Sequence, residues 1–303
     1  MRVPESWQTA EAVPDLRGVV MMLGSVDVGK TTTATAIANA ALRSRRSVVV
    51  VDADTGQSDI GPPATVGLAV GRTPVRSMEQ FPMTAAFFVG DTSPRNVHRY
   101  VVEGTVRAVE WARARRAEVV VVDTTGWVEG PAAAAAKEQE IRYVRPQHVV
   151  ALQWDAEIEP ILARVPSDII VHRLRSSPDV RSRPQEARRA MRMMRFRRYF
   201  ASAQRHTLDL GALPAGRPAV YEGRVIPQHC MLTDIPRHAL RHLLVGLADR
   251  DGWLAAMGSV VDVEPARRGV VVVAPLGSLA GVGALQWGAL RVAPSGREEG
   301  RLA

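Results

Sequence analysis

The segment 24–31 limits the possible folds of this chain more than any other feature. Its eight residues, GSVDVGKT, match the G-x-x-x-x-G-K-[S/T] pattern of a phosphate-binding loop. An apolar run of strand length (19–23) precedes it, and an Ala-rich segment (32–42) that favours a helix follows it. Glycines allow backbone N–H groups to turn toward phosphate oxygens, and the start of the helix adds the positive end of its dipole. The sequence therefore predicts a nucleoside triphosphate site in this loop.

Two side chains of the loop have expected chemical roles. Lys30 is expected to contact the β- and γ-phosphates, and the Thr31 hydroxyl is expected to bind Mg²⁺. Of the 39 lysines and arginines in the chain, only Lys30 and Lys137 are lysines. In a chain that otherwise uses arginine, a lysine in this loop indicates a requirement for a compact charge. The residues assigned to nucleotide binding are Gly24, Ser25, Val26, Asp27, Val28, Gly29, Lys30, Thr31 and Thr32.

Apolar runs and helix-like segments alternate along the first two thirds of the chain. Further apolar runs lie at 47–51, 85–89, 118–122, 149–152 and 169–171, and helical patterns cover 96–116 and 132–144. Buried strands that alternate with helices indicate a parallel sheet with right-handed crossovers. We therefore predict an α/β fold of the P-loop NTPase class, with a parallel sheet flanked by helices. Ligands of such sheets bind beyond the carboxyl ends of the strands, where we expect the polar loops to converge.

Two of these strand ends carry carboxylates that suit phosphoryl chemistry. Asp54 follows the run 47–51, where a carboxylate either binds Mg²⁺ or accepts a proton from an attacking hydroxyl. Asp123 closes its strand as in a Walker B site, and residues 123–126 fit D-x-x-G, in which the backbone approaches a γ-phosphate. The alternatives are a capping aspartate at 54 and an ordinary turn at 123–126. The candidate metal ligands are Thr31, Asp54 and Asp123.

Three further residues of these loops are candidates for substrate binding. The turn that contains Asp54 presents the amide of Gln57, and Thr92 lies in a strand-end loop (90–94) whose hydroxyl and N–H groups suit a second phosphate. Trp127 is a candidate for stacking on a nucleobase, worth roughly 1–3 kcal/mol. The alternatives are a simple turn at 90–94 and a tryptophan packed under its loop.

An arginine-rich segment follows the last of these strands. Residues 173–205 contain eleven arginines and only two acidic residues, and the whole chain carries a net charge of +8. A solvated charged helix is the usual interpretation of such a segment. Charge of almost one sign instead favours a polyanionic partner such as nucleic acid. Pro184 suits the first turn of a helix that runs to about Phe200.

The composition divides the chain into three expected parts. Residues 1–16 form an N-terminal extension, residues 17–210 hold the phosphate loop and the sheet, and residues 211–303 are turn-rich with β-like runs. We expect the last part to be a small, mainly β domain. A hairpin turn is expected at Asp251-Gly252.

Several features favour a soluble, cytoplasmic protein. The uncharged run 269–290 is broken by Pro275 and three glycines, so it is interpreted as short strands and turns rather than a membrane span. The N-terminus has no apolar region typical of a signal peptide. Cys230 is the single cysteine, which excludes an internal disulfide framework and a cysteine-based metal cluster.

Taken together, these motifs resemble those of the polynucleotide 5′-hydroxyl kinase family. This family includes the RNA kinase subunit of the pre-mRNA cleavage complex, the ribosomal-RNA-processing kinase and archaeal relatives. The resemblance covers about residues 17–205. Its motifs are 24–32, 52–63, 90–94 and 123–130, together with Arg183 and Arg188 in the basic segment.

The resemblance implies roles for the residues around the nucleotide. Lys30 and Thr31 hold ATP and Mg²⁺, and Asp54 is the general base for the 5′-hydroxyl. The segment of about 173–200 becomes a lid. Its arginines Arg183 and Arg188 close on the transferring phosphoryl group.

The same resemblance implies how the polynucleotide is held. Gln57 and Thr92 lie where family members meet the substrate phosphate, and Trp127 resembles the clasp that stacks the terminal base. One departure stands at Ala64, since family members often place glycine after the preceding pair of prolines.

We therefore expect ATP-dependent transfer of the γ-phosphate to the 5′-hydroxyl of RNA or DNA. The expected partners are single-stranded 5′ ends, with no membrane and no obligate protein partner. Two alternatives are a regulatory or metal-insertion NTPase switch and a nucleic-acid-binding ATPase without transfer activity. Residues 152–155, LQWD, lack the Asn-Lys-x-Asp element of guanine recognition, so GTP specificity is not indicated. No residue pattern indicates recognition of a 2′-hydroxyl, so RNA and DNA are not distinguished at this level.

Overall fold

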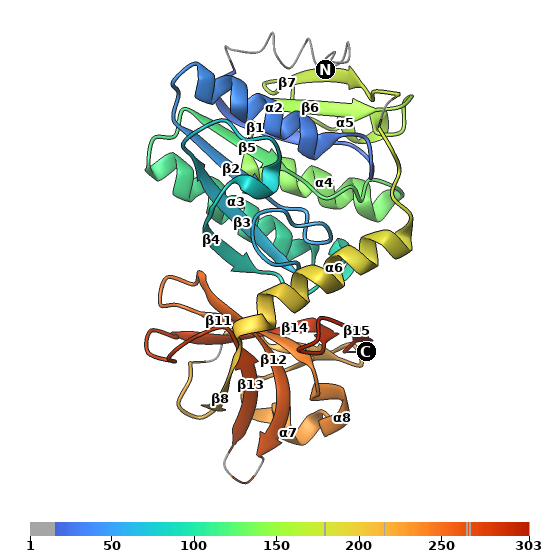
Figure 1. Ribbon diagram of the computed structural model, residues 1–303. Helices are drawn as coiled ribbons and strands as arrows, with labels where there is room; N and C mark the ends of the chain where they lie inside the picture. Colours follow the sequence, from blue (N-terminus) through green and yellow to red (C-terminus); the bar gives the residue numbers. More distant parts are fainter. Residues whose placement is uncertain (1–15, 179, 215, 265, 267, 303) are drawn as a thin grey trace. The chain divides into compact units, whose positions relative to one another are not determined.

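The structure is a computed structural model that describes residues 16–178, 180–214, 216–264, 266 and 268–302 (Figure 1). The expected N-terminal extension, 1–16, therefore lies almost entirely outside the described residues. The chain forms two compact units. The first unit comprises residues up to 61, then 66–85 and 93–184, and the second comprises 62–65, 86–92 and the chain from 185 onward.

A seven-stranded sheet forms the centre of the first unit, with the strand order β4-β3-β2-β5-β1-β6-β7. Strand β5 lies between β1 and β2 and is parallel to both, and β6 is parallel to β1 and to β7. The strands are β1 (Gly18–Leu23), β2 (Val48–Asp52), β3 (Thr65–Gly71), β4 (Met83–Phe88), β5 (Val119–Asp123), β6 (His148–Gln153) and β7 (Ile170–Arg175).

Helices cover both faces of this sheet because alternate residues of its strands point in opposite directions. In β6, Val150 and Leu152 belong to the same apolar cluster as Ile37 of the helix after β1, whereas Val149 and Ala151 belong to the cluster on the other face. The helices are α2 (Lys30–Arg43), α3 (His98–Ala114), α4 (Pro131–Val144) and α5 (Glu159–Leu162), with 3-10 turns at Met78–Gln80 and Pro94–Asn96.

The expected strands and helices of this unit are confirmed, with one difference in strand direction. Strand β3 was not expected, and it pairs with β2 in antiparallel orientation. The segment between β2 and β3 contains no helix, and an antiparallel return does not need one. The sheet is therefore mainly, but not wholly, parallel.

The second unit contains a six-stranded sheet with the order β15-β14-β11-β12-β13-β8 and a separate hairpin of β9 and β10. All pairs in the six-stranded sheet are antiparallel. The strands are β8 (Gln204–Asp209), β9 (Ala219–Tyr221), β10 (Arg224–Ile226), β11 (Leu243–Ala248), β12 (Leu254–Glu264), β13 (Gly269–Ala274), β14 (Ala284–Val292) and β15 (Glu298–Arg301). Short helices are α7 (Met231–Asp234) and α8 (Arg237–Leu240), with 3-10 turns at Phe200–Ser202 and Gln228–Cys230.

The mainly β character expected for the C-terminal part is confirmed. The turn expected at Asp251-Gly252 joins β11 to β12, and Gly252 has the positive φ (78°) that such a turn requires. The uncharged run 269–290 forms β13, a turn and most of β14. None of the described helices has the length and apolar character needed to cross a bilayer.

The arginine-rich helix α6 (Gln185–Tyr199) belongs to the second unit, and its end agrees with the expectation of a helix to about Phe200. Its Phe196 is fully buried in a cluster with Phe88 and Met257. Arg192 forms an ion pair with Glu298 at 2.6 Å. One side of the helix is therefore fixed to the second unit, while Arg197 and Arg198 are exposed.

Residues from the later part of the second unit hold the segment 86–92. Arg301 donates two hydrogen bonds to the buried carboxylate of Asp91, at 2.7 and 2.9 Å. Arg217 donates to the carbonyl oxygens of Phe88 and Val89. Ala64 has φ +69°, a left-handed conformation that glycine adopts more easily, which gives a physical reason for the glycine often found there in the family that the sequence resembles.

Candidate active site

The phosphate loop joins β1 to α2 and is shaped by its glycines. Gly29 has φ +94° and lies directly before the first residue of α2. A side chain at Gly24 would come within 2.4 Å of the Leu152 carbonyl oxygen, so only glycine fits there. Lys30 is 6% exposed and donates a hydrogen bond from Nζ to the Ser25 carbonyl at 2.7 Å. The lysine is thus held across its own loop, where a phosphate oxygen can replace the carbonyl as its partner.

A carboxylate from β5 meets this loop. The Thr31 hydroxyl donates to Asp123 Oδ2 at 2.5 Å, and the other oxygen of Asp123 is buried without a hydrogen-bond partner. Burial raises the pKa of Asp123 to about 7, against the lowering effects of Lys30 and of the Thr31 hydrogen bond. A hydroxyl beside an unpartnered carboxylate oxygen is the oxygen-donor environment that Mg²⁺ prefers. The residues present therefore fit a magnesium ion.

The pKa of Lys30 depends on charged groups from several parts of the site. Burial lowers the pKa of Lys30, the nearby carboxylates of Asp123 and Asp54 raise it, and the ammonium of Lys137 lowers it. The charges of both predicted carboxylates and of the second lysine in the chain thus act on the lysine of the phosphate loop.

Asp54 stands in a loop that is organised by Asp52. Asp52 is opposite Asp123 in the register of β2 and β5, and it accepts hydrogen bonds from the backbone of Asp54 and Ile60. Burial raises the pKa of Asp52 well above its ordinary value, and the charge of Asp123 raises it further. Asp54 Oδ1 in turn accepts the backbone N–H groups of Gly56 (3.0 Å) and Gln57 (3.2 Å). These bonds fix the orientation of the Asp54 carboxylate.

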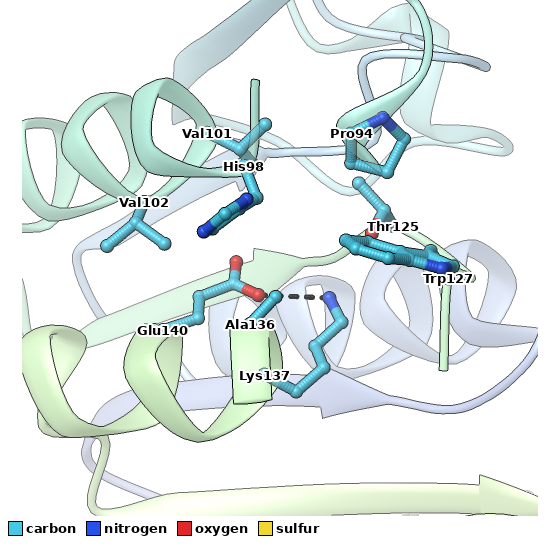
Figure 2. A pocket seen from close by; sticks show the side chains of 9 residues that line it. All are labelled: Pro94, His98, Val101, Val102, Thr125, Trp127, Ala136, Lys137 and Glu140. Carbon is cyan, nitrogen blue, oxygen red and sulfur yellow. Dashed lines mark hydrogen bonds and ion pairs between the residues drawn. The ribbon is translucent and has the colours of Figure 1, made fainter. Parts of the chain in front are cut away.

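The loop after β5 lies against the phosphate loop. A side chain at Gly126 would come within 2.6 Å of Val26, so the two backbones are in close contact. Trp127 is half-buried, and the guanidinium of Arg95 lies 5.9 Å from the centre of its ring. Its ring lines a small cavity together with Pro94 and Lys137 (Figure 2). Trp127 is thus neither a free platform nor a wholly buried core residue.

Arg183, the first of the two arginines predicted to belong to a lid, is bonded through its backbone to the phosphate loop. The Arg183 N–H and the Ser182 hydroxyl both donate to Asp27 Oδ2, at 2.9 and 3.1 Å. The side chain of Arg183 is exposed. Asp27 has a positive φ of 56°, an uncommon conformation for a residue other than glycine, and its carboxylate bonds this segment.

The first unit thus brings together the phosphate loop, Asp54, Gln57, Asp123, Trp127 and Arg183. Two predicted site residues, Thr92 and Arg188, belong to the second unit. Their participation in the site remains a prediction.

Two contributions to the site were not anticipated from the sequence. The sequence assigns no role to Asp52, although its carboxylate holds the loop that carries Asp54. Lys137 was noted only as a rare lysine, and it forms a buried ion pair with Glu140. The scarcity of lysine is the one sequence signal that pointed to position 137.

The mainly parallel sheet, the phosphate loop at the start of α2 and the carboxylate beside Thr31 define a P-loop NTPase. More narrowly, the chain belongs to the family of the mRNA cleavage and polyadenylation factor CLP1 P-loop, whose model matches residues 24–202. The resemblance to the polynucleotide kinase family is thereby confirmed.

Similar proteins include archaeal enzymes that match nearly the whole chain. The polyribonucleotide 5′-hydroxyl-kinase of Pyrococcus horikoshii is 27% identical over 342 residues, covering 99% of this chain and 94% of that protein. The enzyme of the same name from Methanocaldococcus jannaschii is 26% identical, covering 93% of this chain and 89% of that protein. The CLP1 homolog of Drosophila mojavensis is 28% identical over 206 residues, covering 65% of this chain and 48% of that protein.

A solved structure shares the fold. The structure of the Clp1p–Pcf11p complex matches 96% of this chain and 80% of that chain, with a TM-score of 0.70 and 13% sequence identity. Both units therefore have counterparts in a solved structure.

Proposed function

We propose that this chain is an ATP-dependent polynucleotide 5′-hydroxyl kinase, a phosphotransferase that transfers the γ-phosphate of ATP to the 5′-hydroxyl of RNA or DNA. The observation that carries the proposal is the Asp54 carboxylate, which is oriented by two backbone N–H groups and whose charge acts on both Lys30 and Asp123. A switch NTPase needs the lysine and the metal-binding carboxylate but no second, oriented carboxylate. Relatives named polyribonucleotide 5′-hydroxyl-kinases support the same activity.

In this proposal the residues divide the work of an in-line phosphoryl transfer, which depends mainly on positioning and charge neutralisation. Lys30 exchanges its bond to the Ser25 carbonyl for one to the phosphates. Asp54 accepts the proton of the attacking 5′-hydroxyl. Thr31 and Asp123 would hold Mg²⁺, which neutralises charge on the β- and γ-phosphates. Arg183, which is attached through Asp27, supplies a cation at the edge of the nucleotide.

The substrate side of the site follows from the same loops. Trp127 stacks the terminal base, and Gln57 and Thr92 contact the phosphate backbone. Arg188 and the rest of α6 attract the polyanion.

A cytoplasmic location remains a prediction. The expectation of no obligate protein partner also remains untested, and the similar Clp1p structure contains Pcf11p.

The direct test is a transfer assay with labelled ATP and a 5′-hydroxyl oligonucleotide. We expect a 5′-phosphorylated product, lost in Lys30→Ala and lowered at least about 100-fold in Asp54→Asn, because the amide cannot accept the proton. Nucleotide binding, measured by calorimetry, should persist in Asp54→Asn. Hydrolysis of ATP without any labelled oligonucleotide would instead favour a switch or a nucleic-acid-binding ATPase.

A further inference from the structure

A small cavity lies between α3 and α4, beside the loop that follows β5 (Figure 2). Its volume of about 10 Å³ is room for one water-sized group. Apolar atoms form most of its wall, and the polar groups come from both helices. The lining residues are Pro94, His98, Val101, Val102, Thr125, Trp127, Ala136, Lys137 and Glu140.

The polar groups of this cavity are incompletely paired. Glu140 is 3% exposed, and its Oε2 accepts a hydrogen bond from Lys137 Nζ at 2.9 Å. Glu140 Oε1 and His98 Nδ1 are both buried without a hydrogen-bond partner. Such atoms are uncommon in folded proteins, since each costs free energy to bury. The cavity therefore has the features of a site that is completed by a ligand group.

Stability alone does not explain the ion pair. A buried pair is often no better for stability than apolar residues of the same size, and α4 is otherwise rich in alanine. Lys137 is one of only two lysines in the chain, and its charge acts on the other, Lys30. The pair thus lines the same cavity as Trp127, where the substrate end is proposed to bind.

Size and chemistry together select the ligand group. The cavity is too small for a nucleobase, and the Glu140 carboxylate repels a phosphate. A hydroxyl fits, because it donates to an acceptor such as Glu140 Oε1 and accepts from a donor such as the Lys137 ammonium. The 2′-hydroxyl is also the group that distinguishes RNA from DNA.

We propose that this cavity binds the 2′-hydroxyl of the 5′-terminal nucleotide, with Glu140 and Lys137 as its partners, and so makes the enzyme selective for RNA ends. The inference rests on the proposed kinase function and on the stacking of the terminal base at Trp127. It assigns the selection of RNA to side chains of α4, outside the phosphate loop and the lid.

The test compares kcat/KM for three oligonucleotides of one sequence. They are all-RNA, RNA with a single 2′-deoxy sugar at the 5′-terminal nucleotide, and RNA with that change at the third nucleotide. We expect the terminal change to lower kcat/KM about tenfold or more, as for the loss of one hydrogen bond to a charged group, and the third-position change to have no comparable effect.

Two variants locate the effect in the cavity. In Lys137→Met/Glu140→Leu, which replaces the pair with apolar residues of similar size, the all-RNA and terminal-deoxy substrates should be phosphorylated with nearly equal kcat/KM. Glu138→Gln is the matched control. It lies on the same helix, and its carboxylate pairs with Arg142 and Arg164 outside the cavity, so the tenfold ratio should persist.

Each outcome decides the inference. Equal use of the three oligonucleotides by the wild type would overturn it and leave the kinase proposal standing. A ratio that persists in the double variant, with its fold confirmed by a cooperative thermal transition, would also overturn it and assign the cavity to a structural water. Absence of phosphorylation on any oligonucleotide would overturn the kinase proposal as well.

Discussion

At the scale of single residues, the side chains at the nucleotide site are defined by burial as much as by charge. Lys30 is almost fully buried, and burial lowers its pKa while Asp123 and Asp54 raise it. A buried ammonium in such a loop is a compact charge, and a planar guanidinium needs more space and a different arrangement of acceptors. This is consistent with a lysine at position 30 in a chain that otherwise uses arginine.

We therefore expect Lys30→Arg to lower kcat/KM for 5′-phosphorylation at least about 100-fold, as for the loss of a group that stabilises charge in the transition state. The measurement is the initial rate of label transfer from ATP. Arg43→Lys, an exposed exchange in the last turn of the same helix, is the control and should leave the rate unchanged. Near-normal activity of Lys30→Arg would show that any cation suffices at this position.

At the scale of elements, the strand-end segment 86–92 depends on a residue close to the C-terminus. Asp91 is 1% exposed, and its carboxylate is paired with Arg301 through two hydrogen bonds. Removal of one partner of such a pair takes away the charge that offsets the cost of burying the other.

Arg301→Ala should therefore lower the free energy of unfolding by about 2 kcal/mol, less than for a fully buried pair because the Arg301 side chain is 43% exposed. Chemical denaturation measures this change. Arg297→Ala removes an arginine that is 70% exposed, and it should change stability by less than about 0.5 kcal/mol. Equal effects of the two substitutions would contradict a stabilising role of the Asp91 pair.

Elements with strong local patterns were predictable from the sequence. The phosphate loop, the strand before it and Asp123 follow from spacing and apolar runs, which act over a few residues. Strand β3 is not predictable in this way, because it contains two glycines and its partner is set by tertiary pairing.

The cavity beside Trp127 is also not predictable from the sequence, since His98 and Glu140 approach each other only in the folded chain. The membership of α6 in the second unit depends on the packing of Phe196, which a count of arginines does not reveal.

At the scale of the whole molecule, the net charge of +8 acts on any polyanionic substrate. We expect kcat/KM for an RNA end to fall as salt rises from 50 to 200 mM, with a log–log slope that reflects the number of phosphate contacts, about 0.7 for each. Arg197→Gln/Arg198→Gln, on the exposed side of α6, should make the slope shallower by up to about 1.4 if both arginines contact phosphates.

The control for this experiment is Arg43→Gln/Arg45→Gln, which removes the same charge from an exposed part of the first unit. A slope that changes equally in both variants would mean that total charge, and not α6, sets the attraction. An unchanged slope in the α6 variant would exclude this helix from contact with the polynucleotide.

Segments of the two units alternate along the sequence, and this affects how truncation experiments are interpreted. Residues 86–92 lie within the kinase sequence, yet their backbone and Asp91 are bonded to Arg217, Leu290 and Arg301. A fragment that stops at residue 210 would keep every nucleotide-binding motif and lose all three of these supports. Loss of activity on such truncation would thus report a damaged strand end rather than a catalytic contribution from the removed part, and point substitutions are the sounder way to assign tasks to the C-terminal region.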